Sequence, residues 1–298
     1  MLLSPILQHK PLTTSLSFTS CVKSFQVISS PDGSSFEKML ELISPMRPEI
    51  ISIDNEHFSK ALSLKFENEQ SKQIKKDAPS LDDILPKGIM ALVNHFRNLR
   101  DVSLSFSLIS DDLLAAMSDE HVQLETLRIE VHSETKSLPS VSDRAWRYFS
   151  RHSPNINLVL QFYLLEECDY KLILKPCVPV THLFLGESTP SSIVDDVANF
   201  CPALKEIVIS QYGPHTIDET LLLIAKKCTR ISAVGLGDCE ITCSALLDFI
   251  TLCCERLKTF YIWETSLQED SKLDIDTVSA KISILLGRTW HPEFVPFC

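Results

Sequence analysis

The second half of the chain repeats one nine-residue phrase three times. It runs as CPALKEIVI over Cys201–Ile209, as CTRISAVGL over Cys228–Leu236 and as CERLKTFYI over Cys254–Ile262. The copies begin 27 and then 26 residues apart. A repeat of this length cannot bury its apolar face alone, so successive copies must stack against one another. The phrase therefore predicts a solenoid, an architecture that serves mainly to bind other macromolecules.

A shorter form of the phrase, L-x-x-L-x-L, extends the pattern upstream. Leu99–Leu104, Leu124–Ile129 and Val180–Leu185 fit it, and Ile156–Phe162 is a looser version. Each copy alternates apolar and polar residues with the period of a strand, and an amphipathic stretch typical of a helix follows it. The period and pattern are those of leucine-rich repeats. We therefore predict an α/β leucine-rich-repeat solenoid, or horseshoe, of about seven to ten repeats.

The regularity of the pattern predicts three regions. Residues 1–35 form an irregular or poorly ordered N-terminus, residues 36–286 form the repeat domain, and residues 287–298 form an extended tail. Helical spacing just before residue 287 predicts a capping helix of the kind that closes a solenoid. The segment 161–179, which is acidic and ends at a proline, is interpreted as an irregular insertion.

Local signals predict where several helices begin and end. Thr242 is expected to cap one helix, and Thr216 with Glu219 is expected to form a capping box on another. Thr189, which precedes a proline, is a third expected N-cap. Gly287 is the expected C-terminal stop of the last helix.

Composition excludes some classes of partner. The 298 residues are 44% hydrophobic and 22% charged, and 39 acids against 28 bases give a net charge of −11. An acidic chain without a basic stripe is unsuited to nucleic acid or to an anionic membrane surface. No apolar run approaches the roughly 20 residues of a membrane span. A basic surface on a protein partner would suit this charge better.

The ten cysteines are not spaced as metal ligands, and no C-x-x-C motif is present. Cys201, Cys228 and Cys254 occupy the same position of the repeat. Buried cysteine behaves as a small apolar side chain. We therefore expect these three residues to be reduced and part of the core, as in an intracellular protein.

Signatures of catalysis are missing from the sequence. It has no G-x-G-x-x-G, phosphate loop, G-x-S-x-G or H-E-x-x-H motif, and only 7 glycines. We predict no enzyme activity, no cofactor and no metal. The alternative is an enzyme that uses His182 or His215 with nearby acids.

The alternation within the strands predicts which side chains face away from the helices. Phe184, Tyr261 and Trp263 fall on that face, and exposed aromatics beside charges are typical of binding hot spots. The alternative is that the C-terminal cap or tail folds back over Tyr261 and Trp263. The polar residues predicted on the same face are Arg128, Glu130, His182 and Glu206.

Four segments carry a resemblance to a known family. Residues 98–134, 142–162, 230–249 and 286–296 (LGRTWHPEFVP) closely resemble the F-box/leucine-rich-repeat proteins of the cryptochrome-binding type. Because the resemblance includes the tail as well as the repeat, it is more specific than the repeat alone.

The resemblance implies a non-catalytic substrate receptor of an SCF-type E3 ubiquitin ligase. In that family the F-box holds the Skp adaptor and the cullin, and the repeats bind cryptochrome for ubiquitination and degradation. The family's tail inserts into the flavin pocket of cryptochrome. A circadian role in cytoplasm and nucleus is likewise implied. The tail residues expected to contact the partner are Trp290, Phe294, Val295, Pro296, Phe297 and Cys298.

The sequence departs from the family at both ends. Residues 1–35 lack the leucine-rich three-helix pattern of an F-box, so the Skp adaptor and cullin are expected only if the full-length protein has one. The last position holds Cys298, where the family has tryptophan. The alternative function is a leucine-rich-repeat adaptor or competitor without ligase coupling.

Overall fold

The computed structural model divides the chain into two compact units, residues 1–99 and residues 100–298. In the first unit, strand β1 (Ser24–Val27) pairs in parallel with β2 (Ile50–Ile53). The structure describes residues 24–27, 50–53, 90, 93–94, 99–120, 124–132, 138–163, 165–186, 188–210, 216–270 and 273–292. The predicted boundaries at residues 35 and 286 stay predictions.

The second unit is a leucine-rich-repeat solenoid in which strands and helices alternate, as predicted. Its strands form a parallel sheet in the order β3-β4-β5-β6-β7-β8-β10, and β9 pairs with β11 in a small second sheet. The strands are β3 (Asp101–Ser105), β4 (Thr126–His132), β5 (Asn157–Tyr163), β6 (Val180–Leu185), β7 (Glu206–Ser210), β8 (Ala233–Gly237), β9 (Glu240–Thr242), β10 (Thr259–Trp263) and β11 (Ser266–Gln268).

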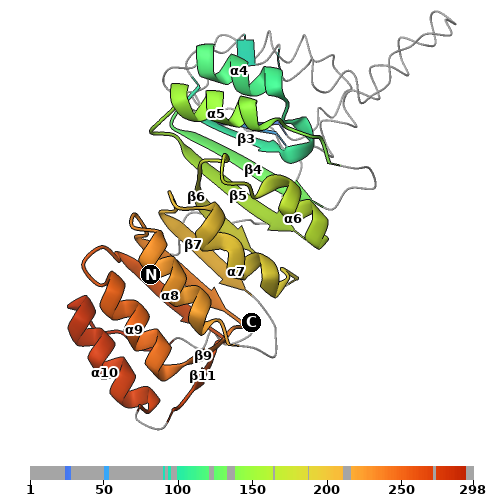
Figure 1. Ribbon diagram of the computed structural model, residues 1–298. Coiled ribbons are helices and arrows are strands. Elements are labelled where there is room, and N and C mark those ends of the chain that lie inside the picture. The colour runs from blue at the N-terminus through green and yellow to red at the C-terminus, as the bar shows by residue number, and fades with distance from the viewer. Residues whose placement is uncertain are drawn as a thin grey trace, which may run out of the picture. The chain divides into compact units, whose positions relative to one another are not determined.

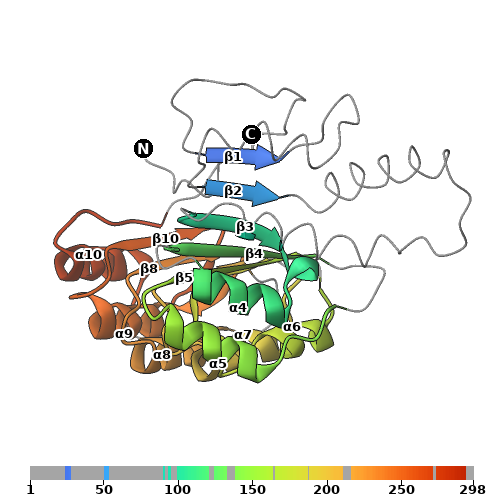
Figure 2. The ribbon, with the colours of Figure 1, turned by 90° about the horizontal axis from the view of Figure 1, so that it is seen from above.

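The described helices of this unit all lie on one face of the large sheet (Figures 1 and 2). The helices are η3 (Phe106–Leu108), α4 (Asp111–Glu120), α5 (Asp143–His152), α6 (Glu167–Ile173), α7 (Ser191–Phe200), α8 (Asp218–Lys227), α9 (Cys243–Cys253) and α10 (Ile275–Leu286). We call the other face of the large sheet the open face.

The aliphatic residues of the phrase form the core between the sheet and the helices. Leu204, Ile207 and Ile231 are fully buried, and so are Leu127 and Leu160 in earlier repeats. Each such side chain stabilises the fold by roughly 1.5–3 kcal/mol relative to exposure. The phrase thus specifies the inward face of the strands that carry it.

Two of the predicted helix ends are confirmed. The Thr242 hydroxyl accepts a hydrogen bond from the Ala245 N–H, and Gly287 ends α10 in the left-handed conformation. Two N-caps were wrong. The backbone of Thr216 forms a β-bridge with Glu240, so α8 begins without a side-chain cap. The Thr189 hydroxyl is buried against the Tyr170 hydroxyl instead of capping α7.

The segment 161–179 is a short repeat and not an insertion. Strand β5 extends into this segment as far as Tyr163, and the seven-residue helix α6 follows. Tyr170 and Ile173 of α6 are each 1% exposed, so they fill the positions that a longer helix would occupy. The acids suggested a loop, but they lie at the start of this helix, where negative charge is favourable.

The expected core cysteines are confirmed at two of three positions. Cys201 and Cys228 are buried and end α7 and α8, and the Cys228 thiol donates to the Cys201 carbonyl over 3.4 Å. Cys254 is only half-buried, and its neighbour Cys253 lies in the core instead. The reason is that Cys254 keeps a helical backbone, whereas Cys201 and Cys228 leave the helix.

Within the part of the chain that the structure describes, no helix has the length and apolar character needed to cross a membrane. The same described ranges contain no cluster of three or more histidine, cysteine or acidic residues arranged to hold a metal.

Candidate binding face

Strand register aligns the outward side chains in rows across the open face. Tyr261 pairs with Gly235, Gly235 with Val208, and Val208 with Phe184. A neighbouring row contains Arg128, Val159, His182, Glu206, Ala233 and Thr259. The structure therefore confirms that the predicted aromatic and charged residues share one face. Their contact with a partner stays a prediction.

At the β4–β5 side of this face, polar and aromatic side chains contact one another. His132 stacks on Tyr163 with 4.6 Å between ring centroids, and its Nε2 lies 3.7 Å from Glu130 Oε2. Burial, followed by the nearby Glu130 carboxylate, raises the pKa of Tyr163 to about 12. Tyr163 is therefore neutral and available only as a hydrogen-bonding phenol.

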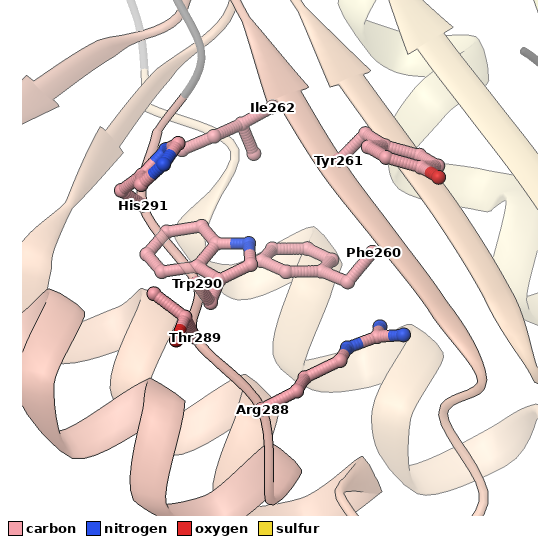
Figure 3. Close-up of a pocket in the computed structure, with 7 residues that line it drawn as sticks. All are labelled: Phe260, Tyr261, Ile262, Arg288, Thr289, Trp290 and His291. Carbon is pink, nitrogen blue, oxygen red and sulfur yellow. The ribbon is translucent and has the colours of Figure 1, made fainter. Parts of the chain in front are cut away.

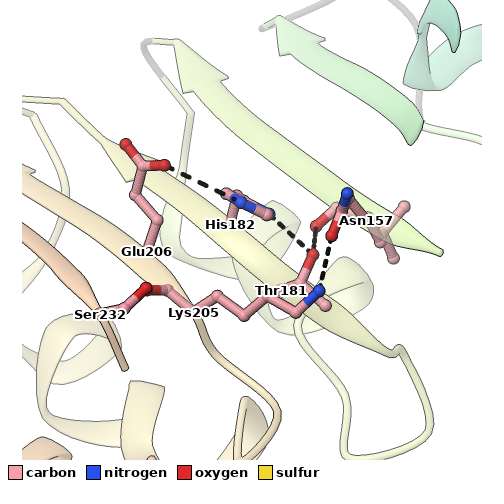
Figure 4. Close-up of polar contacts among 7 residues, drawn as sticks. Asn157, Thr181, His182, Lys205, Glu206 and Ser232 are labelled. Carbon is pink, nitrogen blue, oxygen red and sulfur yellow. Dashed lines mark hydrogen bonds and ion pairs between the residues drawn. The ribbon is translucent and has the colours of Figure 1, made fainter. Parts of the chain in front are cut away.

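His182 lies at the centre of the open face, beside Glu206 on the next strand (Figure 4). The two side chains are 3.9 Å apart, from Nε2 to Oε2. Burial, with the nearby Lys205 and Arg128 cations, lowers the pKa of His182 to about 4, and burial raises the pKa of Glu206. His182 is therefore neutral near pH 7, and this contact is not a charged ion pair.

The hydroxyl, imidazole and carboxylate of Thr181, His182 and Glu206 follow the order of a catalytic triad but do not form one. Thr181 is 5% exposed, and its hydroxyl donates to the Leu158 carbonyl over 3.0 Å. The same hydroxyl lies 2.8 Å from His182 Nδ1, and because its own proton is directed at Leu158 it accepts a hydrogen bond from the Nδ1–H. A nucleophile needs its own proton directed at the base. Thr181 therefore cannot act as one, and His215, the other predicted histidine, lies outside the described residues.

Lys205 marks the edge of the face where β5, β6 and β7 begin. Its ammonium donates to the Asn157 amide oxygen over 2.7 Å, and its backbone carbonyl accepts from the Ser232 hydroxyl (Figure 4). Burial, followed by the Arg230 cation, lowers the pKa of Lys205. These bonds tie successive repeats together.

The β8–β10 side of the open face has an aromatic surface. A Cβ atom placed on Gly237 would lie only 2.1 Å from Cε2 of Trp263, and one placed on Gly235 would lie 3.1 Å from its Cζ3. The indole of Trp263 therefore covers both glycines. Tyr261 is 50% exposed beside it. The described part of the C-terminal cap and tail therefore leaves Tyr261 half-exposed, and the part of that alternative that concerns residues 293–298 lies outside the described residues.

Trp290, the first of the expected tail contacts, is packed into the end of the solenoid. Its ring stacks on Phe260 with 5.5 Å between centroids, and only 7% of the residue is exposed. The backbone N–H of Trp290 donates to the Ser283 hydroxyl of α10, which donates back to the Trp290 backbone carbonyl. The Trp290 ring is therefore part of the core at the end of the solenoid.

A cavity of about 290 Å³ lies at the edge of β10, beside Trp290 (Figure 3). It is lined by Phe260–Ile262 and by Arg288–His291. Figure 3 shows Tyr261 pointing away from the stacked rings of Phe260 and Trp290. The other expected tail contacts, Phe294, Val295, Pro296, Phe297 and Cys298, lie outside the described residues.

Comparison with known proteins identifies relatives along most of the chain. It is 34% identical over 286 residues to F-box/LRR-repeat protein 21 of Mus musculus and 33% identical to that of Ovis aries, with 86% of this chain covered. The chain spans 66% of the length of these relatives. F-box only protein 33 of Mus musculus is 23% identical over 67% of this chain and 40% of its own length. No protein-family model matches.

Proposed function

Because this chain belongs to the F-box/leucine-rich-repeat protein family, we propose that it is the substrate-recognition subunit of an SCF-type E3 ubiquitin ligase. In this proposal the open face binds the substrate protein, and other subunits transfer ubiquitin. An F-box of the full-length protein would hold the Skp adaptor and, through it, the cullin.

The observation that carries the proposal is the half-exposed Tyr261 beside Trp263 on the open face. The helices already bury the aliphatic face of the sheet, so these aromatics contribute little to the core. Large aromatic side chains concentrate binding energy in protein interfaces, where they are buried only in the complex. The open face is therefore suited to bind another protein.

The proposed substrate is a cryptochrome-like protein, marked for degradation in the cytoplasm or nucleus. Its support is the resemblance of the repeats and of residues 286–296 to cryptochrome-binding receptors. The net charge of −11 suits a partner with a basic surface.

Affinity capture with the 298-residue chain tests the proposal. A cryptochrome-like protein should be retained, and Tyr261→Ala should weaken its binding about tenfold or more. Tyr148→Ala is the matched control, because Tyr148 is 37% exposed on the helical layer, in α5. If both variants bind like the parent chain, the open face is not the binding site.

Two further arms test the tail and the ligase. A deletion of residues 293–298 keeps Trp290 in place and should reduce binding if the tail enters the partner. The Skp adaptor is added in a parallel capture, with a longer form of the chain where one exists. Retention of the substrate without the adaptor would favour the alternative, an adaptor or competitor lacking ligase coupling.

A further inference from the structure

The Trp263 indole at the β8–β10 side of the open face rests with one side against the sheet. We define the aromatic platform as Tyr261 and Trp263, with Gly235 and Gly237 beneath the indole. Cβ atoms placed on Gly235 and Gly237 would lie closest to Cζ3 and Cε2, on opposite sides of the six-membered ring, so the indole extends over both positions of β8. Its other face therefore points away from the sheet. Trp263 is a partly exposed residue, so a ligand can reach part of the indole.

A carboxylate borders the platform. Asp238 directly follows β8, and the hydroxyl of Ser210 donates to its Oδ2 over 2.7 Å. Ser210 pairs with Gly237, and Gly237 pairs with Trp263. The carboxylate is thus held in the same row as the indole, and no described residue donates a hydrogen bond to Oδ1.

The charge around the platform is negative. Glu264 directly follows Trp263, and the row Ser210, Gly237 and Trp263 contains no base. Among the described cations, Arg288 lines the cavity beside Tyr261, at the other end of the platform. A cationic ligand would therefore be favoured at the Trp263 end of the platform, next to Asp238.

We propose that the aromatic platform receives an arginine side chain of the partner protein. A guanidinium can stack flat on the outer face of the Trp263 indole while its edge donates to the Asp238 carboxylate. Arginine fits better than lysine because the guanidinium group is planar and is more weakly hydrated than an ammonium group. A purely apolar ligand would leave Asp238 without compensation. The inference rests on the proposed function, since it names the partner group that the open face would recognise.

A peptide titration tests the platform without the partner. The probes are capped tripeptides Gly-X-Gly in which X is arginine, citrulline, lysine or leucine, added to the full chain while the indole N–H signals are followed by NMR. Citrulline has the shape of arginine without its charge. We expect arginine to shift the Trp263 signal and to bind about tenfold more tightly than citrulline.

Asp238→Asn removes the charge but keeps the shape, and asparagine tolerates the positive φ of 55° at this position. This variant should bind the arginine peptide about tenfold more weakly. Equal shifts from arginine and citrulline, an unchanged affinity in Asp238→Asn, or a stronger effect of the leucine peptide would each overturn the inference. A lysine effect equal to that of arginine would overturn the preference for guanidinium.

The same variant separates this inference from the proposed function. In the affinity capture, Asp238→Asn should weaken binding of the cryptochrome-like protein about tenfold. If arginine binds as expected but no such protein is retained, the proposed function fails and the platform stands. If the protein is retained equally by Asp238→Asn and the parent chain, the platform fails and the proposed function stands.

Discussion

The two sides of the open face present side chains from equivalent strand positions but differ in how those side chains are used. On the side formed by β4, β5 and β6, which we call the β4–β6 side, they contact one another, as in the stack of His132 on Tyr163 and the contact of His132 with Glu130. On the β8–β10 side the Trp263 indole rests on two glycines and presents its outer face. A ligand on the first side must replace existing contacts, whereas a ligand on the second side need not. Side chains at equivalent strand positions are therefore not equally accessible to a ligand.

The aromatic platform also has a particular layer of the core behind it. Behind the platform, Phe260 of β10 is 2% exposed and packs against Trp290, which α10 holds through Ser283. The exposed aromatic side of the sheet is thus supported by a buried aromatic pair. The predictions below test this support first and the exposed surfaces afterwards.

The largest effect is expected from Trp290→Ala. Removing a buried indole leaves a cavity against Phe260, so the free energy of unfolding should fall by about 3–5 kcal/mol. Urea denaturation followed by circular dichroism measures the change. Trp290→Phe keeps a stacked ring and should lose clearly less. A loss below about 1 kcal/mol in Trp290→Ala would show that the tail is not part of the core.

A smaller effect is expected from Gly237→Ala. Because the new methyl group would lie about where the Trp263 ring now rests, the indole must move, at a cost of roughly 1–3 kcal/mol. The NMR signal of the Trp263 indole should shift in the absence of any ligand. The control is Ala233→Gly, which changes an outward position of the same strand away from the indole. An unchanged signal in Gly237→Ala would refute the placement of Trp263 over β8.

The repeat pattern predicted the fold and the outward positions of Phe184, Tyr261 and Trp263, because alternation alone decides which face a strand residue occupies. It could not predict that Trp263 covers the neighbouring strand. A signal was present, since Gly235 and Gly237 stand at outward positions where the preceding strand has Val208 and Ser210. The burial of Trp290 has no counterpart in the repeat, because it depends on where the chain turns after Gly287.

The pH dependence of stability tests the β4–β6 side. The folded pKa of His182 is about 4, below its ordinary 6.5, so between these values the unfolded chain binds a proton that the folded protein does not. Stability from this group is therefore lost as the pH falls from 6.5 to 4, on the order of 1 kcal/mol. The raised pKa of Glu206 acts in the opposite direction, since acid then favours the folded state.

His182→Gln removes the first contribution and keeps the second. Urea denaturation at pH 7 and at pH 4.5 should show a smaller acid loss in this variant than in the parent chain. Glu206→Gln is the matched control and should show a larger acid loss. Identical pH dependence in all three proteins would contradict the buried, neutral state of His182.

The smallest effect on stability is expected from Tyr261→Ala. Tyr261 is half-exposed and lies outside the core, so the free energy of unfolding should change by no more than about 0.5 kcal/mol. Tyr163→Ala is the matched change on the other side of the face and should cost about 1 kcal/mol, because it removes the stack on His132. The ranking should reverse in the affinity capture, where Tyr261→Ala is the more damaging variant. If Tyr163→Ala weakens binding more, the partner uses the β4–β6 side, and the contacts there are exchanged on binding.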